Sequence, residues 1–137
     1  MRLVRVGVIE AMTCAGLLAL SMPLAVAQDD LCGRKREAPD ALYNRLTTSE
    51  KLKEGFRDKS YVTVTDTVSN VIWTFTVPGH PAHPSVVCRQ PVEEPGKDLQ
   101  IRMDVQCSAA EAACEKLVDA FEDLNRRMLQ DARKNLK

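Results

Sequence analysis

The sequence predicts an α+β domain: a four-stranded antiparallel β-meander, short N-terminal helices before it, and one long C-terminal helix packed on one face. Two observations support this class. Residues 61–77 repeat with a period of two and are rich in β-branched and aromatic side chains, as strands are. After residue 108, apolar residues recur every three or four positions, which is typical of an amphipathic helix.

Residues 1–27 have the composition of a secretory signal peptide. Two arginines lie near the start, a short apolar run follows, and Ala25–Gln28 reads A-V-A-Q, which predicts cleavage after Ala27. The apolar run is shorter than the roughly 20 residues that a membrane-spanning helix needs. We therefore expect residues 28–137 to form one exported domain, in the periplasm or secreted, with no stable membrane insertion after signal removal.

Two short helices are expected before the sheet, over residues 38–46 and 48–56. Pro39 suits a first helical turn, Ser49 can cap the second helix, and Gly55 can end it. The chain contains no internal repeat or low-complexity tract that would indicate another architecture.

The first two strands are expected over residues 61–68 and 71–77, joined by the two-residue turn Ser69–Asn70. One face then carries apolar side chains and the other mostly threonines, the pattern of a sheet with one solvated side. This register places Asp66 opposite Trp73. We expect the Asp66 carboxylate to accept a hydrogen bond from the indole N–H, a structural role rather than a functional one.

A second hairpin is expected around Glu93–Asp98, where Pro95 and Gly96 fit the central positions of a type II turn. The resulting register places Cys88 opposite Met103. In this arrangement Cys88 points toward the core of the domain.

The long C-terminal helix is expected to begin at Ser108–Glu111, which reads S-A-A-E and resembles a capping box. Its apolar stripe consists of Ala110, Cys114, Leu117, Phe121, Leu124 and Met128. Basic residues gather at its end, where they complement the helix dipole, so we interpret them as a solvated helix end. Basic and acidic residues number 19 each over the whole chain, and we expect no nucleic-acid partner.

Four cysteines follow the signal peptide, Cys32, Cys88, Cys107 and Cys114, and they predict two disulfides formed in an oxidising compartment. The expected register separates Cys88 from Cys107 by roughly 13 Å, whereas a bridge requires Cα atoms within about 7 Å. We therefore favour Cys32–Cys88 and Cys107–Cys114, although the second bridge requires an adapted corner between strand and helix. The absence of a C-x-x-C pair argues against a redox enzyme.

Both histidines lie in residues 77–87, V-P-G-H-P-A-H-P-S-V-V, and each precedes a proline. Such residues favour extended or polyproline conformations, so we expect a stiff, exposed connection with His80 and His83 on the same side. The candidate binding loop comprises His80, Pro81, His83 and Pro84. Two alternatives stay open: the loop plugs a partner's cleft, as in an inhibitor or immunity-type protein, or His80 and His83 bind copper or zinc weakly.

No nucleophile with a base and an orienting carboxylate can be identified, so we expect neither catalysis nor a cofactor. The blocks W-T-F-T-V-P-G-H-P-A-H-P-S-V-V-C-R (Trp73–Arg89) and C-S-A-A-E-A-A-C-E-K-L-V-D-A-F-E-D-L-N (Cys107–Asn125) resemble uncharacterised small exported proteins of proteobacteria. The resemblance implies export and a strand-rich body followed by a helix, and it brings no activity or site residues. We expect a non-catalytic binding or accessory protein of the cell envelope, with another envelope protein as its partner.

Overall fold

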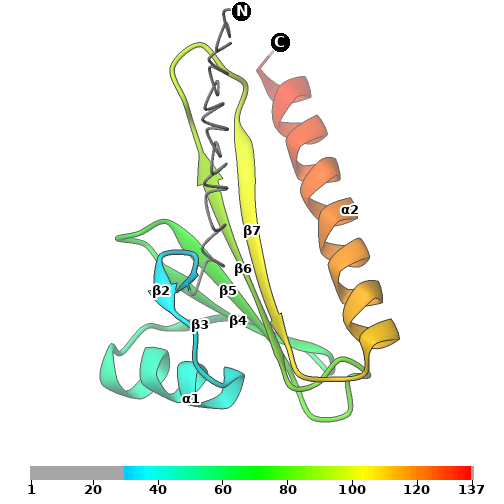
Figure 1. The fold of residues 1–137 in the computed structure, drawn as a ribbon. Coiled ribbons are helices and arrows are strands. Elements are labelled where there is room, and N and C mark those ends of the chain that lie inside the picture. Colours follow the sequence, from blue (N-terminus) through cyan, green and yellow to red (C-terminus); the bar gives the residue numbers. More distant parts are fainter. Residues whose placement is uncertain (1–29, 137) are drawn as a thin grey trace, which may run out of the picture.

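The computed structural model describes residues 30–136, so the predicted signal peptide lies outside the described residues. The elements are β1 (Asp30–Leu31), β2 (Arg34–Lys35), α1 (Pro39–Asn44), η1 (Arg45–Ser49), β3 (Glu54–Arg57), β4 (Tyr61–Asp66), β5 (Val71–Thr76), β6 (Ser85–Val92), β7 (Gln100–Cys107) and α2 (Glu111–Asn135). Five strands form one antiparallel sheet in the order β3-β4-β5-β6-β7, and β1 pairs with β2 separately (Figure 1). The α+β class and the long C-terminal helix are confirmed, but the meander has five strands rather than four.

Each face of the sheet is covered by a different part of the chain (Figure 1). The N-terminal elements cover the face that carries Trp73, and this core contains Leu31, Leu42, Leu46, Val62, Val64, Val71, Trp73, Phe75, Val86 and Cys88. α2 covers the opposite face over β6 and β7, where the second buried cluster contains Ala82, Val87, Leu117 and Phe121. The most apolar face is therefore covered by the N-terminal segment and not by the long helix.

The second N-terminal helix expected over residues 48–56 is wrong. α1 continues into the π-helical segment η1, which ends at Ser49, and Lys51 then adopts a positive φ of 57°. The chain next forms β3, the edge strand, which pairs with β4 in a bulged register. Pairing with β4 outweighs the local helix preference, since Phe56 N–H donates to Thr63 Oγ1 at 2.8 Å.

The β4–β5 hairpin has the expected faces, but its register is shifted by two residues. Asp66 pairs with Val71 rather than with Trp73. Its carboxylate accepts two backbone N–H groups of the connection 67–70, at 3.0 and 3.2 Å, and a bond from Arg34 at 3.1 Å. The expected bond from the indole to Asp66 is therefore wrong, and the indole N–H has no partner in the described structure.

The β6–β7 hairpin contains the expected turn at Pro95–Gly96. Lys97 N–H donates to the Glu94 carbonyl at 3.0 Å, and Gly96 adopts a φ of 76°, as a type II turn requires. The pairing of β6 with β7 nevertheless starts at Val92 and Gln100, so residues 93–99 form the connection. More residues of this connection follow Pro95–Gly96 than precede it. The unequal connection changes the register by one residue.

This slip exchanges the two faces of β7 relative to the expectation, because side chains alternate along a strand. Cys88 pairs with Asp104 rather than with Met103. Met103 and Val105 instead pack with the α2 cluster. Cys88 itself points into the core, as expected, and is 0% exposed.

The Cys32–Cys88 disulfide joins the β1–β2 hairpin to the middle of the sheet, with Cα atoms 6.2 Å apart. Cys32 N–H donates to Asp104 Oδ2 at 2.8 Å, and Arg36 Nη1 donates to the Val105 carbonyl at 3.1 Å. The N-terminal hairpin is thus held by one covalent bond and by polar contacts to β7. This bridge is one of the two favoured from the sequence.

The second disulfide, Cys107–Cys114, spans the corner between β7 and α2, with Cα atoms 5.9 Å apart. It is also the pairing favoured from the sequence. Ser108 N–H donates to the Pro84 carbonyl at 3.1 Å, so the strand pairing extends one step past β7. α2 consequently begins at Glu111 without a side-chain cap, and the expected capping box from Ser108 is not formed.

Replacing Cys32 and Cys88 together by alanine should lower the free energy of unfolding more than replacing Cys107 and Cys114 together. The two bridges join residues 56 and 7 positions apart. The entropy of loop closure alone predicts a difference of about 2 kcal/mol between the two losses. Urea denaturation of the three proteins measures it, and equal losses would contradict this expectation.

Candidate binding site

The connection between β5 and β6, residues 77–84, consists of two successive turns. His80 N–H donates to the Val77 carbonyl at 3.1 Å, and His83 N–H donates to the His80 carbonyl at 2.9 Å. Gly79 adopts a φ of 96°, which side chains disfavour. The loop is therefore folded back on itself and does not have the expected polyproline conformation.

His80 connects this loop to the side of the sheet covered by α2. Ala82 N–H donates to His80 Nδ1 at 3.0 Å, and His80 Nε2 lies 3.0 Å from Tyr61 Oη. Because Nδ1 accepts a bond, the neutral ring carries its proton on Nε2 and donates to the phenol oxygen. Tyr61 in turn packs edge-on against Phe121 of α2, with ring centroids 5.6 Å apart. Both nitrogens of His80 thus have structural partners.

His83 lies in another environment, close to the end of β5. Its Nδ1 is 3.0 Å from the Thr76 carbonyl oxygen, so in the neutral ring Nδ1 donates and Nε2 is left as an acceptor. Thr76 Oγ1 accepts Ser85 N–H at 2.9 Å and lies 3.1 Å from Ser85 Oγ. The Ser85 hydroxyl therefore faces Thr76, and the imidazole is not arranged to activate it as a nucleophile.

The two imidazoles have different hydrogen-bond partners: His80 bonds to Tyr61 and Ala82, and His83 bonds to Thr76. Within residues 30–136, the one group of three potential metal ligands is Cys32, Cys88 and Asp104, and its two cysteines form a disulfide. A copper or zinc ion bound by His80 and His83 would first have to displace hydrogen bonds of the loop. Metal binding stays a prediction that no contact of the loop favours.

A cavity of about 190 Å³, here called the loop cavity, opens between α1, β3 and the 77–84 loop. Its apolar floor is formed by core residues, including Val62 and Phe75, and its polar rim includes Asp40, Arg57 and His83. The complete lining is Pro39, Asp40, Tyr43, Arg57, Val62, Phe75, Thr76, Val77, Pro78, His83 and Ser85. Of the candidate loop residues His80, Pro81, His83 and Pro84, only His83 lines it.

Tyr43 and Arg57 form one side of the loop cavity and are fixed by mutual contacts. Arg57 donates to Tyr43 Oη at 3.0 Å and pairs with Glu54 at 2.6 Å, while the Tyr43 hydroxyl also bonds to Glu54. The hydrogen bond from Arg57 holds the pKa of Glu54 below its ordinary value. Tyr43 packs edge-on against Phe75, with ring centroids 5.4 Å apart. Neither residue was identified from the sequence. Residues 48–56 were expected to form a helix rather than to lead into β3, so nothing placed Arg57 beside Tyr43 of α1.

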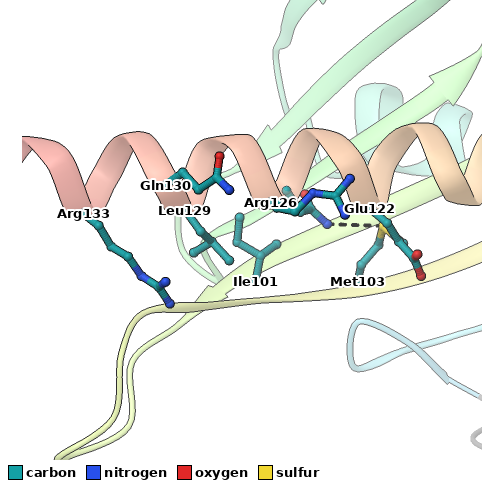
Figure 2. Close-up of a pocket in the computed structure, with 8 residues that line it drawn as sticks. Ile101, Met103, Glu122, Arg126, Leu129, Gln130 and Arg133 are labelled. Atoms are coloured by element: carbon teal, nitrogen blue, oxygen red, sulfur yellow. Dashed lines mark hydrogen bonds between the residues drawn. The ribbon is translucent and has the colours of Figure 1, made fainter.

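A second hollow of about 500 Å³, here called the α2 groove, lies between α2 and β7 (Figure 2). It is lined by Ile101, Met103, Glu122, Asn125, Arg126, Leu129, Gln130 and Arg133. The basic residues of α2 are balanced by carboxylates: Arg126 and Arg127 pair with Asp123, and Arg133 pairs with Asp98 at 3.2 Å. These pairs support the interpretation of a solvated helix end.

Arg89 of β6 is a buried cation beneath α2. Its Nη1 lies 3.5 Å from Asn125 Oδ1 and 3.5 Å from Met128 Sδ, and its guanidinium lies 5.3 Å from the Phe121 ring centroid. No carboxylate in the described part of the chain pairs with Arg89, and burial lowers its pKa below the ordinary value. The contact between α2 and the sheet therefore includes a buried cation that is held by neutral groups rather than by a carboxylate.

None of the helices in residues 30–136 has the length and apolar character needed to cross a bilayer. No family model, no curated protein and no solved structure matches the chain. A functional proposal therefore rests on the geometry of the loop cavity and its neighbours.

Stability should decrease on acidification partly through His80. Burial lowers the pKa of His80 from its ordinary value of 6.5, and the neighbouring His83 adds to this shift. The stabilisation from the neutral ring is present above the unfolded-state pKa and is lost as the pH falls through the lowered folded-state pKa.

We expect the urea midpoint of the wild-type protein to fall between about pH 7 and pH 5. The decrease should be shallower in His80→Gln, which cannot be protonated. Parallel urea titrations across this range provide the measurement, and identical slopes in the two proteins would assign the pH dependence to other groups.

Proposed function

We propose that the chain is a non-catalytic binding protein of the cell envelope that holds a side chain of a protein partner in the loop cavity. The observation that carries this proposal is the combination of an apolar floor and a polar rim drawn from separate elements. Val62 and Phe75 belong to the floor, and Asp40, Arg57 and His83 belong to the rim. Such a composition is typical of recognition sites.

The size of the loop cavity favours one inserted side chain. Its volume of about 190 Å³ is below the roughly 300–1,000 Å³ of sites for drug-sized ligands. A protein partner can supply one anchoring side chain there and add further contacts around the rim. The two disulfides support location in an oxidising compartment, where another envelope protein would be available as partner.

The polar groups of the rim favour an anchor that ends in a hydrogen-bond donor. His83 Nε2 is an acceptor when Nδ1 donates to Thr76, and Asp40 supplies an acceptor carboxylate. Arg57 already donates to Glu54 and Tyr43. The anchor that fits best is apolar along its length and carries a donor at its tip.

Binding rather than catalysis is also supported by Ser85. Ser85 is 1% exposed, and its hydroxyl faces Thr76 rather than the imidazole of His83. A serine nucleophile requires an accessible hydroxyl within hydrogen-bonding reach of a base. The cavity offers fixed groups for recognition, with no activated nucleophile among the groups described.

Val77→Phe should fill part of the loop cavity with an apolar group, because Val77 lines it. Capture of the partner from an envelope extract should weaken by about tenfold, which corresponds to ~1.4 kcal/mol of binding free energy. Pro81→Ala is the matched control, since Pro81 is exposed on the same loop outside the cavity lining. Quantitative pull-down, together with urea midpoints that verify folding, provides the measurement.

Unchanged capture by Val77→Phe would place the binding site elsewhere. Loss of capture in Pro81→Ala alone would instead favour the exposed loop as the contact, as in an inhibitor or immunity-type protein.

A further inference from the structure

The two edges of the five-stranded sheet differ in their protection against pairing with another strand. β3, at one edge, is short, has a bulged register and carries the charged residues Glu54 and Arg57, all of which discourage pairing. β7, at the other edge, spans Gln100–Cys107 and pairs with β6 without interruption. The outer edge of β7 is therefore the better template for an added strand.

The backbone groups of Ile101 and Met103 point outward from this edge. Ser108 N–H bonds across to the segment preceding β6 at 3.1 Å, so alternate residues counted from Ser108 pair with β6. The residues between them point away, and the Val105 carbonyl accordingly accepts Arg36 Nη1 at 3.1 Å. Arg36 thus occupies the edge at Val105, while the outward groups of Ile101 and Met103 have no partner in residues 30–136.

The side chains of the same two residues line the α2 groove (Figure 2). Leu129 lies beside Ile101, so the groove has an apolar strip directly next to the unpaired edge. Glu122 lies near Met103, and Arg133 lies beyond Ile101 toward the helix end. Arg126, which also lines the groove next to Glu122, is already paired with Asp123. Glu122 at one end and Arg133 at the other are therefore the charges that a second copy of the same surface can complement.

We propose that this surface binds a second copy of the chain through antiparallel pairing of two β7 strands around Arg102. Ile101 then pairs with the partner's Met103, and the reverse pair follows from the two-fold symmetry. Arg102 lies opposite its own copy but diagonal to the partner's Asp104, which moderates the repulsion. The result is a continuous sheet through both chains, independent of the loop cavity.

The same two-fold axis brings the two α2 helices side by side and antiparallel. The axis at Arg102 places Met103 of one chain next to Ile101 of the other. Glu122, near Met103, then lies at the end of the partner's groove where the Arg133 side chain extends from the helix toward β7. By symmetry this contact between Glu122 and the partner's Arg133 occurs twice. Within one chain, Glu122 and Arg133 are about 16 Å apart along the helix and cannot form a pair. Arg133 can change partners, since its bond to Asp98 is at the surface and its side chain is 62% exposed.

Charge reversal tests this arrangement in the mature chain by sedimentation equilibrium. Wild-type protein should form a concentration-dependent dimer. Glu122→Arg and Arg133→Glu should each weaken it by at least about tenfold, because each creates two like-charge contacts. The double variant, Glu122→Arg with Arg133→Glu, should recover most of the wild-type affinity.

Recovery in the double variant is diagnostic, since the two side chains meet only between copies. A circular dichroism melt verifies that the exposed substitutions leave the fold intact. A wild-type protein that stays monomeric at every concentration would overturn the proposal and leave the edge to a strand of another protein. A dimer that neither single reversal weakens, or that the double variant does not restore, would overturn it as well.

Discussion

The covalent link between Cys32 and Cys88 determines how the apolar face of the sheet is covered. The β1–β2 hairpin has strands of only two residues, too few to hold it on the sheet by pairing alone. The bridge fixes Leu31 in the core, and the chain that follows places Leu42 of α1 over the same face. Since α1 supplies Tyr43 to the loop cavity, the candidate site depends on the same constraint.

The parts of the fold that could be predicted are those whose pattern is local. The alternation in β4 and β5 and the spacing of apolar residues in α2 are readable without tertiary information. β3 could not be predicted, because its residues acquire strand geometry only by pairing with β4. The register of β7 was also beyond prediction, although the turn at Pro95–Gly96 was identified correctly. The longer connection after the turn shifts the register by one residue, so every side chain of β7 lies on the face opposite to the expected one.

The disulfide connectivity was predicted correctly even though the register behind it was not. Cys107 pairs across the strands with Ser85, while Cys88 pairs with Asp104, and the two cysteines point to opposite faces. In the observed register these orientations exclude a bridge between the two cysteines, whereas in the expected register their separation of roughly 13 Å excluded it. For the candidate site, His83 stood out in the sequence because of its prolines, whereas Tyr43 and Arg57 approach it only in the folded chain.

The two coverings of the sheet are held in different ways, and this has a consequence for local opening. Burial of a guanidinium without a carboxylate partner carries a desolvation cost, which opposes the apolar contacts beneath the C-terminal half of α2. The start of α2, by contrast, is tied to β7 by Cys107–Cys114. The C-terminal half of α2 can thus separate from the sheet while the start of the helix stays attached to β7. We expect the backbone amides of this half to exchange hydrogen earlier than those of the core that Cys32–Cys88 anchors on the opposite face of the sheet.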